Sequence, residues 1–258
     1  MKKKMKRKCI STSLIRANKE LIYTLPYAKH YELTFFKSED IEIIQRFLNE
    51  RNSTFGIHAP FIFRYKEIHP NPTSLNDELR DDTFKKNIEC AHLAKNMGAQ
   101  YIVIHYPNAM QKEDWRAEKK VVDSSTKHLT ELREIIDIRI ENVYFNDSFH
   151  SAEDFSWLLK ESNATLCLDI GHLLLDSEQY EFDVVKFIDT LEEYISEVHI
   201  YYADIETYQK CHHAPWGDSK EFLRLLDRIR YLDCDFTIEA SNDCKSGLEK
   251  LFEYWEGL

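Results

Sequence analysis

Histidines and carboxylates occur at or near the ends of short apolar runs along most of this 258-residue chain. His58 ends one such run in Gly-Ile-His-Ala-Pro, and His105 ends the next in Val-Ile-His-Tyr-Pro. The later runs and the loop after the seventh run carry further side chains of this kind: Glu141, Asp169, His172, His199, His213 and Glu239. Imidazole and carboxylate together form a ligand set suited to zinc, manganese, iron or cobalt. The pattern predicts a divalent-metal site if the fold brings these runs together.

Each of these residues, taken alone, has an ordinary structural explanation. A single histidine at a strand end is more often a satisfied structural residue than a ligand, and a single carboxylate there often caps a helix. The set differs because Glu141, Asp169 and Glu239 would meet in one place from apolar strands. Buried like charges are costly unless a cation or a proton neutralises them. We therefore favour one metal site over unrelated structural roles.

The apolar runs themselves predict eight β-strands. Most of their residues are β-branched or aromatic, and several runs are apolar nearly throughout, which is typical of strands covered on both faces. The predicted strands are Cys9–Ser13, Tyr31–Phe35, Phe55–Ala59, Tyr101–Tyr106, Ile138–Val143, Thr165–Ile170, Val198–Tyr202 and Phe236–Ala240.

Helical periodicity fills most of the gaps between these runs. Phe222, Leu225, Leu226 and Ile229, for example, predict one buried helical stripe. The first gap is the weakest, because the segment 18–30 is short and is interrupted by Pro26. A strand followed by a helix, repeated eight times, predicts an α/β fold of the (β/α)₈ TIM-barrel type in a single domain over residues 1–258. This fold keeps its chemistry at the C-terminal ends of the strands, where the polar residues stand.

Composition narrows the class of protein. Hydrophobic residues make up 43% and charged residues 31% of the chain, and the net charge of −11 argues against a nucleic-acid partner. No apolar run approaches the ~20 residues of a membrane span, so we expect no membrane partner. The basic segment 1–8 lacks the apolar stretch of a signal peptide. Six cysteines without a Cys-x-x-Cys pair favour reduced thiols, for most of them, in a cytoplasmic protein.

The order of these motifs resembles the xylose isomerase-like barrel superfamily, which contains sugar isomerases and epimerases and also endonuclease IV. The resemblance extends from the second run to the eighth, and Leu-Asp-Ile-Gly-His at 168–172 is its most specific part. It implies that a central metal is held by four residues, namely Glu141, Asp169, His199 and Glu239. It also implies that His58 and His105 serve a second metal in the endonuclease branch, with Glu141 bridging the two.

A third metal is not expected. In the superfamily the residues that match His172 and His213 serve such a metal, or, for His172, contact the oxygens of a sugar. Cys211 stands where the endonucleases have an aspartate, and the first run lacks their histidine. We therefore predict that Cys211 is unligated and that His213 faces substrate or solvent.

Two reactions fit this ligand set. The first is isomerisation or epimerisation of a sugar or sugar phosphate, in which a divalent metal (zinc, manganese, cobalt or magnesium) stabilises an enediolate. The resemblance implies that Glu141 and Glu239 also act catalytically by exchanging the carbon-bound proton. Aromatic residues, Phe61, Tyr106 and Trp216, could enclose a small substrate or could equally belong to the core.

The alternative reaction is phosphodiester hydrolysis by an endonuclease IV-like enzyme acting on abasic sites in DNA. The presence of His58, His105 and His213 favours it, whereas the net charge of −11 and the missing aspartate do not. A non-catalytic barrel would predict a degraded ligand set, which is not seen. We favour the isomerase or epimerase; the sequence leaves the oligomeric state open, a homo-oligomer included.

Overall fold

The computed structural model describes residues 6–61, 70–241, 244 and 246–258, and its strands form one closed parallel barrel in which each strand pairs with its neighbours in sequence order. β1 also pairs with β8, which closes the sheet. The strands are β1 (Lys8–Ser11), β2 (His30–Leu33), β3 (Thr54–His58), β4 (Ile102–His105), β5 (Ile138–Glu141), β6 (Thr165–Asp169), β7 (Ile195–Ile200) and β8 (Asp235–Ile238). The predicted TIM-barrel fold is confirmed.

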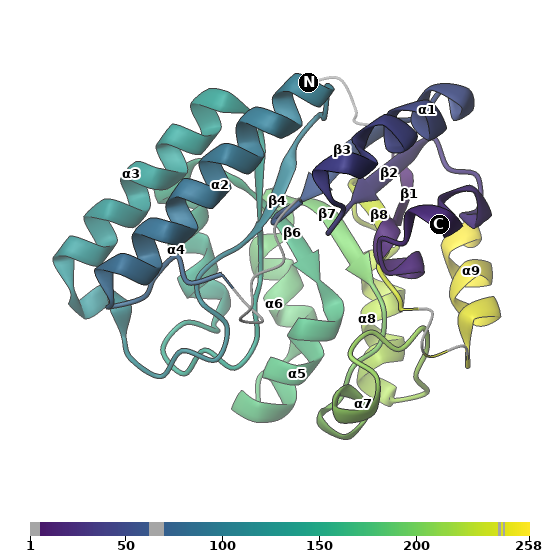
Figure 1. Cartoon of the computed structure of the whole chain (residues 1–258). Helices are drawn as coiled ribbons and strands as arrows, with labels where there is room; N and C mark the ends of the chain where they lie inside the picture. Colours follow the sequence, from purple (N-terminus) through teal and green to yellow (C-terminus); the bar gives the residue numbers. More distant parts are fainter. Residues whose placement is uncertain (1–5, 62–69, 242–243, 245) are drawn as a thin grey trace.

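Helices cover the outside of the barrel, with α2 to α4 on one side and α1 and α9 on the other (Figure 1). They are α1 (Ile41–Arg51), α2 (Asp77–Met97), α3 (Lys119–Ile135), α4 (Ala152–Ser162), α5 (Ile170–Tyr180), α6 (Val184–Leu191), α7 (Ile205–Lys210), α8 (Lys220–Ile229) and α9 (Leu248–Gly257). The apolar stripe predicted for 222–229 is the buried face of α8. Among the described residues, no helix is both long enough and apolar enough to cross a bilayer.

The first β/α unit departs from the repeat. β1 ends at Ser11 rather than at Ser13, because Thr12–Ile15 turn directly into a 3₁₀ helix. A second 3₁₀ helix (Lys19–Thr24) follows, and no α-helix forms before β2. These two short 3₁₀ helices occupy most of the segment between β1 and β2, and Pro26 follows them. The seventh strand also starts earlier than predicted, at Ile195, because Ile195 and Glu197 already pair with β6, with a register shift between Leu166 and Cys167.

The interior of the barrel is filled largely by polar side chains, which is unusual for this fold. His30, Glu32, Arg139, Glu197 and Asp235 are all buried there. The hydrophobic core lies instead between the outer faces of the strands and the helices, where residues such as Ile104, Leu168 and Val198 pack. The strands thus direct apolar side chains toward the helices and polar or charged side chains into the barrel.

Candidate metal centre

Four side chains, which we call the central cluster, meet at the C-terminal end of the barrel: Glu141, Asp169, His199 and Glu239. Each offers a ligand atom, and these atoms all lie within 4.8 Å of one another. All four residues are buried, with exposed fractions of 5% or less. Strand register explains the meeting, because Asp169 on β6 pairs directly with His199 on β7. The structure therefore brings together the four residues expected to hold a central metal.

His199 directs one ring nitrogen at the carboxylates of this cluster. Its Nδ1 lies 3.1 Å from Glu239 Oε2, 3.7 Å from Asp169 Oδ2 and 4.0 Å from Glu141 Oε1. Yet Nδ1 of His199 and the two nearest of these oxygens are buried without a hydrogen bond of acceptable geometry. Buried polar atoms without partners are rare in native proteins and need an explanation. A cation among them would supply one, so the donor set fits a divalent metal.

Glu141 also belongs to a second group, with His58 from β3 and His105 from β4. Its Oε2 lies 2.7 Å from His58 Nε2 and 3.3 Å from His105 Nε2. The two imidazole rings meet edge to face, with centroids 5.0 Å apart. Both histidines therefore lie beside the central cluster, and Glu141 is shared by the two groups.

Local structure fixes the orientation of Asp169. Its Oδ1 accepts a hydrogen bond from the backbone N–H of His172 at 2.7 Å and caps α5, which leaves Oδ2 for the cluster. Asn142 holds the backbone of Asp169 on both sides: its side-chain oxygen accepts from the Asp169 N–H at 2.8 Å, and its amide donates to the Asp169 carbonyl at 2.9 Å. Gly171 belongs to the same motif. A larger residue does not fit at this position, because its Cβ would lie 2.1 Å from the Tyr201 ring.

The electrostatics of the site are those of carboxylates kept charged by imidazoles. Burial opposes ionisation of Glu239, but the neighbouring His199 outweighs it and lowers the pKa of Glu239 to about 2. Burial likewise opposes charge on His58, yet the carboxylate of Glu141 outweighs it and raises the pKa of His58 to about 10. Without a metal, the histidines therefore take over part of the neutralisation.

The proposed substrate residues fall into two groups. His172 and His213 border the central cluster: His172 Nδ1 lies 3.4 Å from Glu141 Oε1, and His213 Nδ1 lies 3.9 Å from Glu239 Oε2. Phe61 and Tyr106 are fully buried, and they pack against Phe36 and Trp115 in the core. Trp216 packs on Phe222 of α8 and on Tyr254 of α9.

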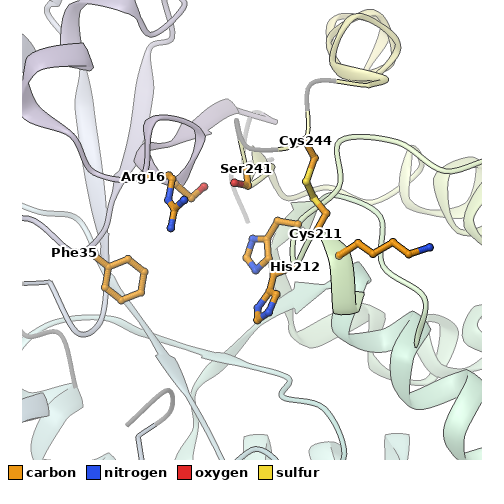
Figure 2. Close-up of a pocket in the computed structure, with 9 residues that line it drawn as sticks. Arg16, Phe35, Cys211, His212, Ser241 and Cys244 are labelled. Carbon is orange, nitrogen blue, oxygen red and sulfur yellow. A yellow bond between two sulfur atoms is a disulfide. The ribbon is translucent and has the colours of Figure 1, made fainter. Parts of the chain in front are cut away.

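An open cavity of about 370 Å³ adjoins the central cluster. His213 connects the two, since it both lines the cavity and approaches Glu239. Figure 2 shows Arg16 and Phe35 on one side of the cavity and His212 with Cys211 and Cys244 on the other. Among the residues that the structure describes, the lining side chains include no carboxylate: Ser13, Arg16, Phe35, Lys210, Cys211, His212, His213, Ser241 and Cys244. The trio of aromatic residues predicted from sequence does not contribute to this wall.

Comparison with known proteins agrees with this architecture. The family model of xylose isomerase-like TIM barrels matches residues 25–256. The chain belongs to this family. Comparison with curated proteins found no match.

Solved structures similar to this xylose isomerase-like barrel extend over nearly the whole chain. A D-tagatose 3-epimerase-like protein has a TM-score of 0.67 at 22% identity, with 97% of each chain covered. The 3-keto-D-glucoside 4-epimerase from E. coli reaches 0.72 at 12% identity, covering 98% of this chain and 100% of the other. D-allulose 3-epimerase from Methylomonas sp., in complex with D-allulose, reaches 0.66 at 16%, covering 98% and 90%. At such identities the similarity establishes the fold.

Cys211 corrects one sequence-based expectation for this xylose isomerase-like barrel. It forms a disulfide with Cys244, 33 residues away, with the two Cα atoms 6.3 Å apart. The prediction that most of the six cysteines are reduced thiols is confirmed by Cys9, Cys90, Cys167 and Cys234, and Cys211 and Cys244 are the exceptions. A sulfur atom in a disulfide has no thiolate to offer a metal. The bond ties the loop after β7, which carries His213, to the loop after β8.

Two buried residues of the site were not anticipated from the sequence. Asn142 is one, and Glu32 on β2 is the other: its Oε2 lies 3.2 Å from His199 Nε2. Burial raises the pKa of the Glu32 carboxyl to about 7. A signal for Glu32 was present, since it is a lone carboxylate inside the apolar run Tyr31–Phe35.

Proposed function

We propose that this protein is a divalent-metal-dependent isomerase or epimerase of a sugar or sugar phosphate, acting through an enediolate. The observation that carries the proposal is the central cluster: three carboxylates and one imidazole, buried, convergent and left without sufficient neutralising partners. Such an arrangement is unfavourable in a protein that has no cation to place there. The same arrangement suits a site that binds one.

Glu141, Asp169, His199 and Glu239 would hold the metal, with zinc, manganese, cobalt and magnesium as candidates. When bound, a divalent metal would polarise vicinal substrate oxygens and stabilise the negative charge that develops when the proton between them leaves. Asn142 holds the backbone of Asp169 in place from both sides, so little reorganisation of this ligand would be required.

Proton transfer is assigned to two of the cluster carboxylates. Glu141 comes from β5 and Glu239 follows β8, so they approach the centre from different sides of the barrel. One carboxylate can accept a proton from one face of a substrate carbon while the other returns a proton to the opposite face, as epimerisation requires. His199 lowers the pKa of Glu239 to about 2, so this carboxylate is ionised at neutral pH.

A small polar substrate suits the cavity beside the cluster. Its volume of about 370 Å³ lies in the range of small-molecule sites. His172 and His213 border the cluster with ring nitrogens able to contact hydroxyl groups. Two of the similar solved structures named above are sugar epimerases, one of them in complex with D-allulose, and the third is an epimerase-like protein. By analogy we extend the substrate class, a sugar or its phosphate, to this chain.

Phosphodiester hydrolysis remains the second candidate because of one observation. His58, His105 and Glu141 form a second group of ligand atoms within 4.8 Å of one another, beside the central cluster. Two adjacent metals are a common arrangement in phosphodiesterases. DNA would then be the partner, although a protein with a net charge of −11 repels a phosphate backbone.

Deuterium exchange distinguishes the two candidates. The manganese- or cobalt-loaded protein is incubated in D₂O with a panel of ketoses and ketose phosphates, and in parallel with abasic-site DNA. We expect deuterium at the carbon next to the carbonyl of at least one ketose, and a loss of ~10²–10⁴-fold in Glu239→Gln and in Glu141→Gln. Glu153→Gln, an exposed residue of α4, is the matched control. Metal-dependent nicking of DNA without any exchange would assign the second function instead.

A further inference from the structure

Glu32 lies directly behind the central cluster, on β2, and is 0% exposed. Its Oε2 is 3.2 Å from His199 Nε2. Its other oxygen, Oε1, is buried without a hydrogen bond, so among the described residues His199 is the hydrogen-bond partner of this carboxyl. Glu32 therefore meets the cluster through the imidazole of His199.

The two nitrogens of the His199 ring face opposite environments. Nδ1 points to Glu239 Oε2 and Asp169 Oδ2, whereas Nε2 points to Glu32. A neutral imidazole carries one proton, and a nitrogen that binds a metal must be the one without it. A carboxylate next to Nε2 favours the proton on Nε2, which leaves the lone pair of Nδ1 for the centre.

We propose that Glu32 is a positioning residue that holds His199 with its proton on Nε2 and aims Nδ1 at the metal, and that it thereby raises metal affinity. The proposal rests on the metal dependence in the proposed function but on neither the substrate nor the reaction. Carboxylate–histidine–metal triads of this kind orient the ring and increase its basicity as a ligand.

A purely structural role explains Glu32 less well. Glu197, also buried inside the barrel, shows what a structural carboxylate looks like here: it is bonded to Arg139 at 2.6 Å, to Tyr101 at 3.1 Å and to Thr237. Glu32 has neither an arginine or lysine partner nor a second hydrogen bond among the described residues. A buried carboxylate with one partner is costly to the fold, and that cost is understandable if the partner is a metal ligand.

The test measures metal affinity in Glu32→Ala and Glu32→Gln by competition of Co²⁺ with a chromophoric chelator, together with the visible spectrum of the bound Co²⁺. We expect the dissociation constant to rise by ~10–100-fold in the alanine variant, with a changed spectrum. The glutamine variant should lie between wild type and alanine, because its amide oxygen can still accept from Nε2–H but carries no charge. Thr237→Val is the matched control: Thr237 lies beside His199 in register but bonds Glu197, so cobalt affinity should stay within about twofold of wild type.

Three results would overturn the proposal. One is unchanged cobalt affinity and spectrum in the folded alanine variant, or in the glutamine variant if alanine does not fold. Another is equal weakening in Thr237→Val, which would indicate general loosening of the barrel. The third is a wild-type protein that binds no cobalt, which would also remove the proposed function. A wild type that binds cobalt but exchanges no ketose deuterium would contradict the proposed function alone.

Discussion

Two clusters of buried charge share the interior of this barrel, and they are built on opposite principles. The first, which we call the lower cluster, lies at the N-terminal ends of the strands and consists of Arg7, Arg139, Glu197 and Asp235. Each of its charged side chains has a partner of opposite charge in the protein. Arg139 bonds Glu197 at 2.6 Å and Asp235 at 2.8 Å, and Arg7 bonds Asp235 through two nitrogens. The central cluster, at the C-terminal ends, gathers three carboxylates around His199 and has no arginine or lysine among its described ion-pair partners.

The difference is what we expect if the lower cluster stabilises the fold and the central cluster binds the proposed metal. Two arginines and two carboxylates make the lower cluster neutral without help. The central cluster has an excess of negative charge, and several of its polar atoms lack a hydrogen bond. Proteins tolerate such imbalance chiefly at functional sites. The comparison therefore predicts that perturbing the lower cluster costs stability, whereas perturbing the central cluster costs metal binding.

The largest expected effect is at Arg139. Arg139→Met would leave Glu197 and Asp235 buried beside each other without the cation between them, which should destabilise the fold by about 3–5 kcal/mol. Urea unfolding in the presence of a chelator measures this loss. Arg133→Met is the control, because Arg133 lies near the same end of the barrel but is exposed, and it should cost below about 1 kcal/mol. Equal losses in the two variants would contradict the role given to the lower cluster.

The next effect concerns the rim of the C-terminal mouth, where the disulfide rather than charge joins two loops. Replacing both Cys211 and Cys244 by serine should lower the free energy of unfolding by about 2–4 kcal/mol in oxidising buffer, since the bond closes a long loop. In reducing buffer wild type and variant should unfold alike. Metal content should not change, because neither sulfur faces the central cluster as a thiolate. Loss of metal in the variant would show that these residues contribute to the centre.

The sequence predicted the residues of the central cluster, but not the two buried residues that contact them, Glu32 and Asn142. Glu141, Asp169 and Glu239 end or follow apolar runs, and in a parallel barrel all strand ends on one side meet, so spacing alone places them together. Glu32 and Asn142 were missed because their importance depends on which neighbour they contact in three dimensions. The lone carboxylate in the run Tyr31–Phe35 marked Glu32 as unusual but did not indicate its contact with His199, and an amide next to a ligand has no pattern of its own.

The disulfide and the structure of the first β/α unit could not be predicted from the sequence for a related reason. Cys211 and Cys244 lie 33 residues apart and meet only because β7 and β8 are neighbours in the barrel. Two 3₁₀ helices follow β1 where the repeat would place an α-helix, and the local sequence does not exclude an α-helix there. Pro26 indicated only that this unit is irregular.

A moderate effect should appear in the pH dependence of the lower cluster. Burial, and after it the charge of Arg7, lowers the pKa of His30 to about 3. In the unfolded chain the pKa of a histidine is about 6.5, so between about pH 6.5 and pH 3 the unfolded chain binds a proton that the folded protein does not bind. The free energy of unfolding therefore falls as the pH drops below about 6.5. The loss is roughly 2 kcal/mol between pH 7 and pH 5, and His30→Gln should remove it.

His128 provides the internal check on that prediction. It lies buried on α3 in the helix layer, far from any cluster, and burial lowers its pKa to about 3 as well. His128→Gln should remove a similar share of the pH dependence, and the double variant both shares. Chemical unfolding at a series of pH values gives the slopes. A single variant with the full wild-type slope would show that its histidine is charged in the folded protein.

The smallest expected effect is at Asp169, and its sign is opposite to that at Arg139. In metal-free protein, Asp169→Asn removes one of three neighbouring negative charges and keeps the oxygen that caps α5. We expect the free energy of unfolding to stay equal or rise by up to about 1 kcal/mol. Urea unfolding with a chelator measures it. A loss comparable to that of Arg139→Met would mean that the central cluster is structural after all.

Elemental analysis of the purified protein tests the central claim most directly. Wild type dialysed against a mixture of zinc, manganese, cobalt and magnesium should retain at least about one equivalent of a divalent metal, and Glu239→Gln should retain much less, because it loses one charged ligand. Arg139→Met, where it folds, should retain as much as wild type. Equal and negligible metal in wild type and Glu239→Gln would contradict the assignment of the central cluster as a metal centre.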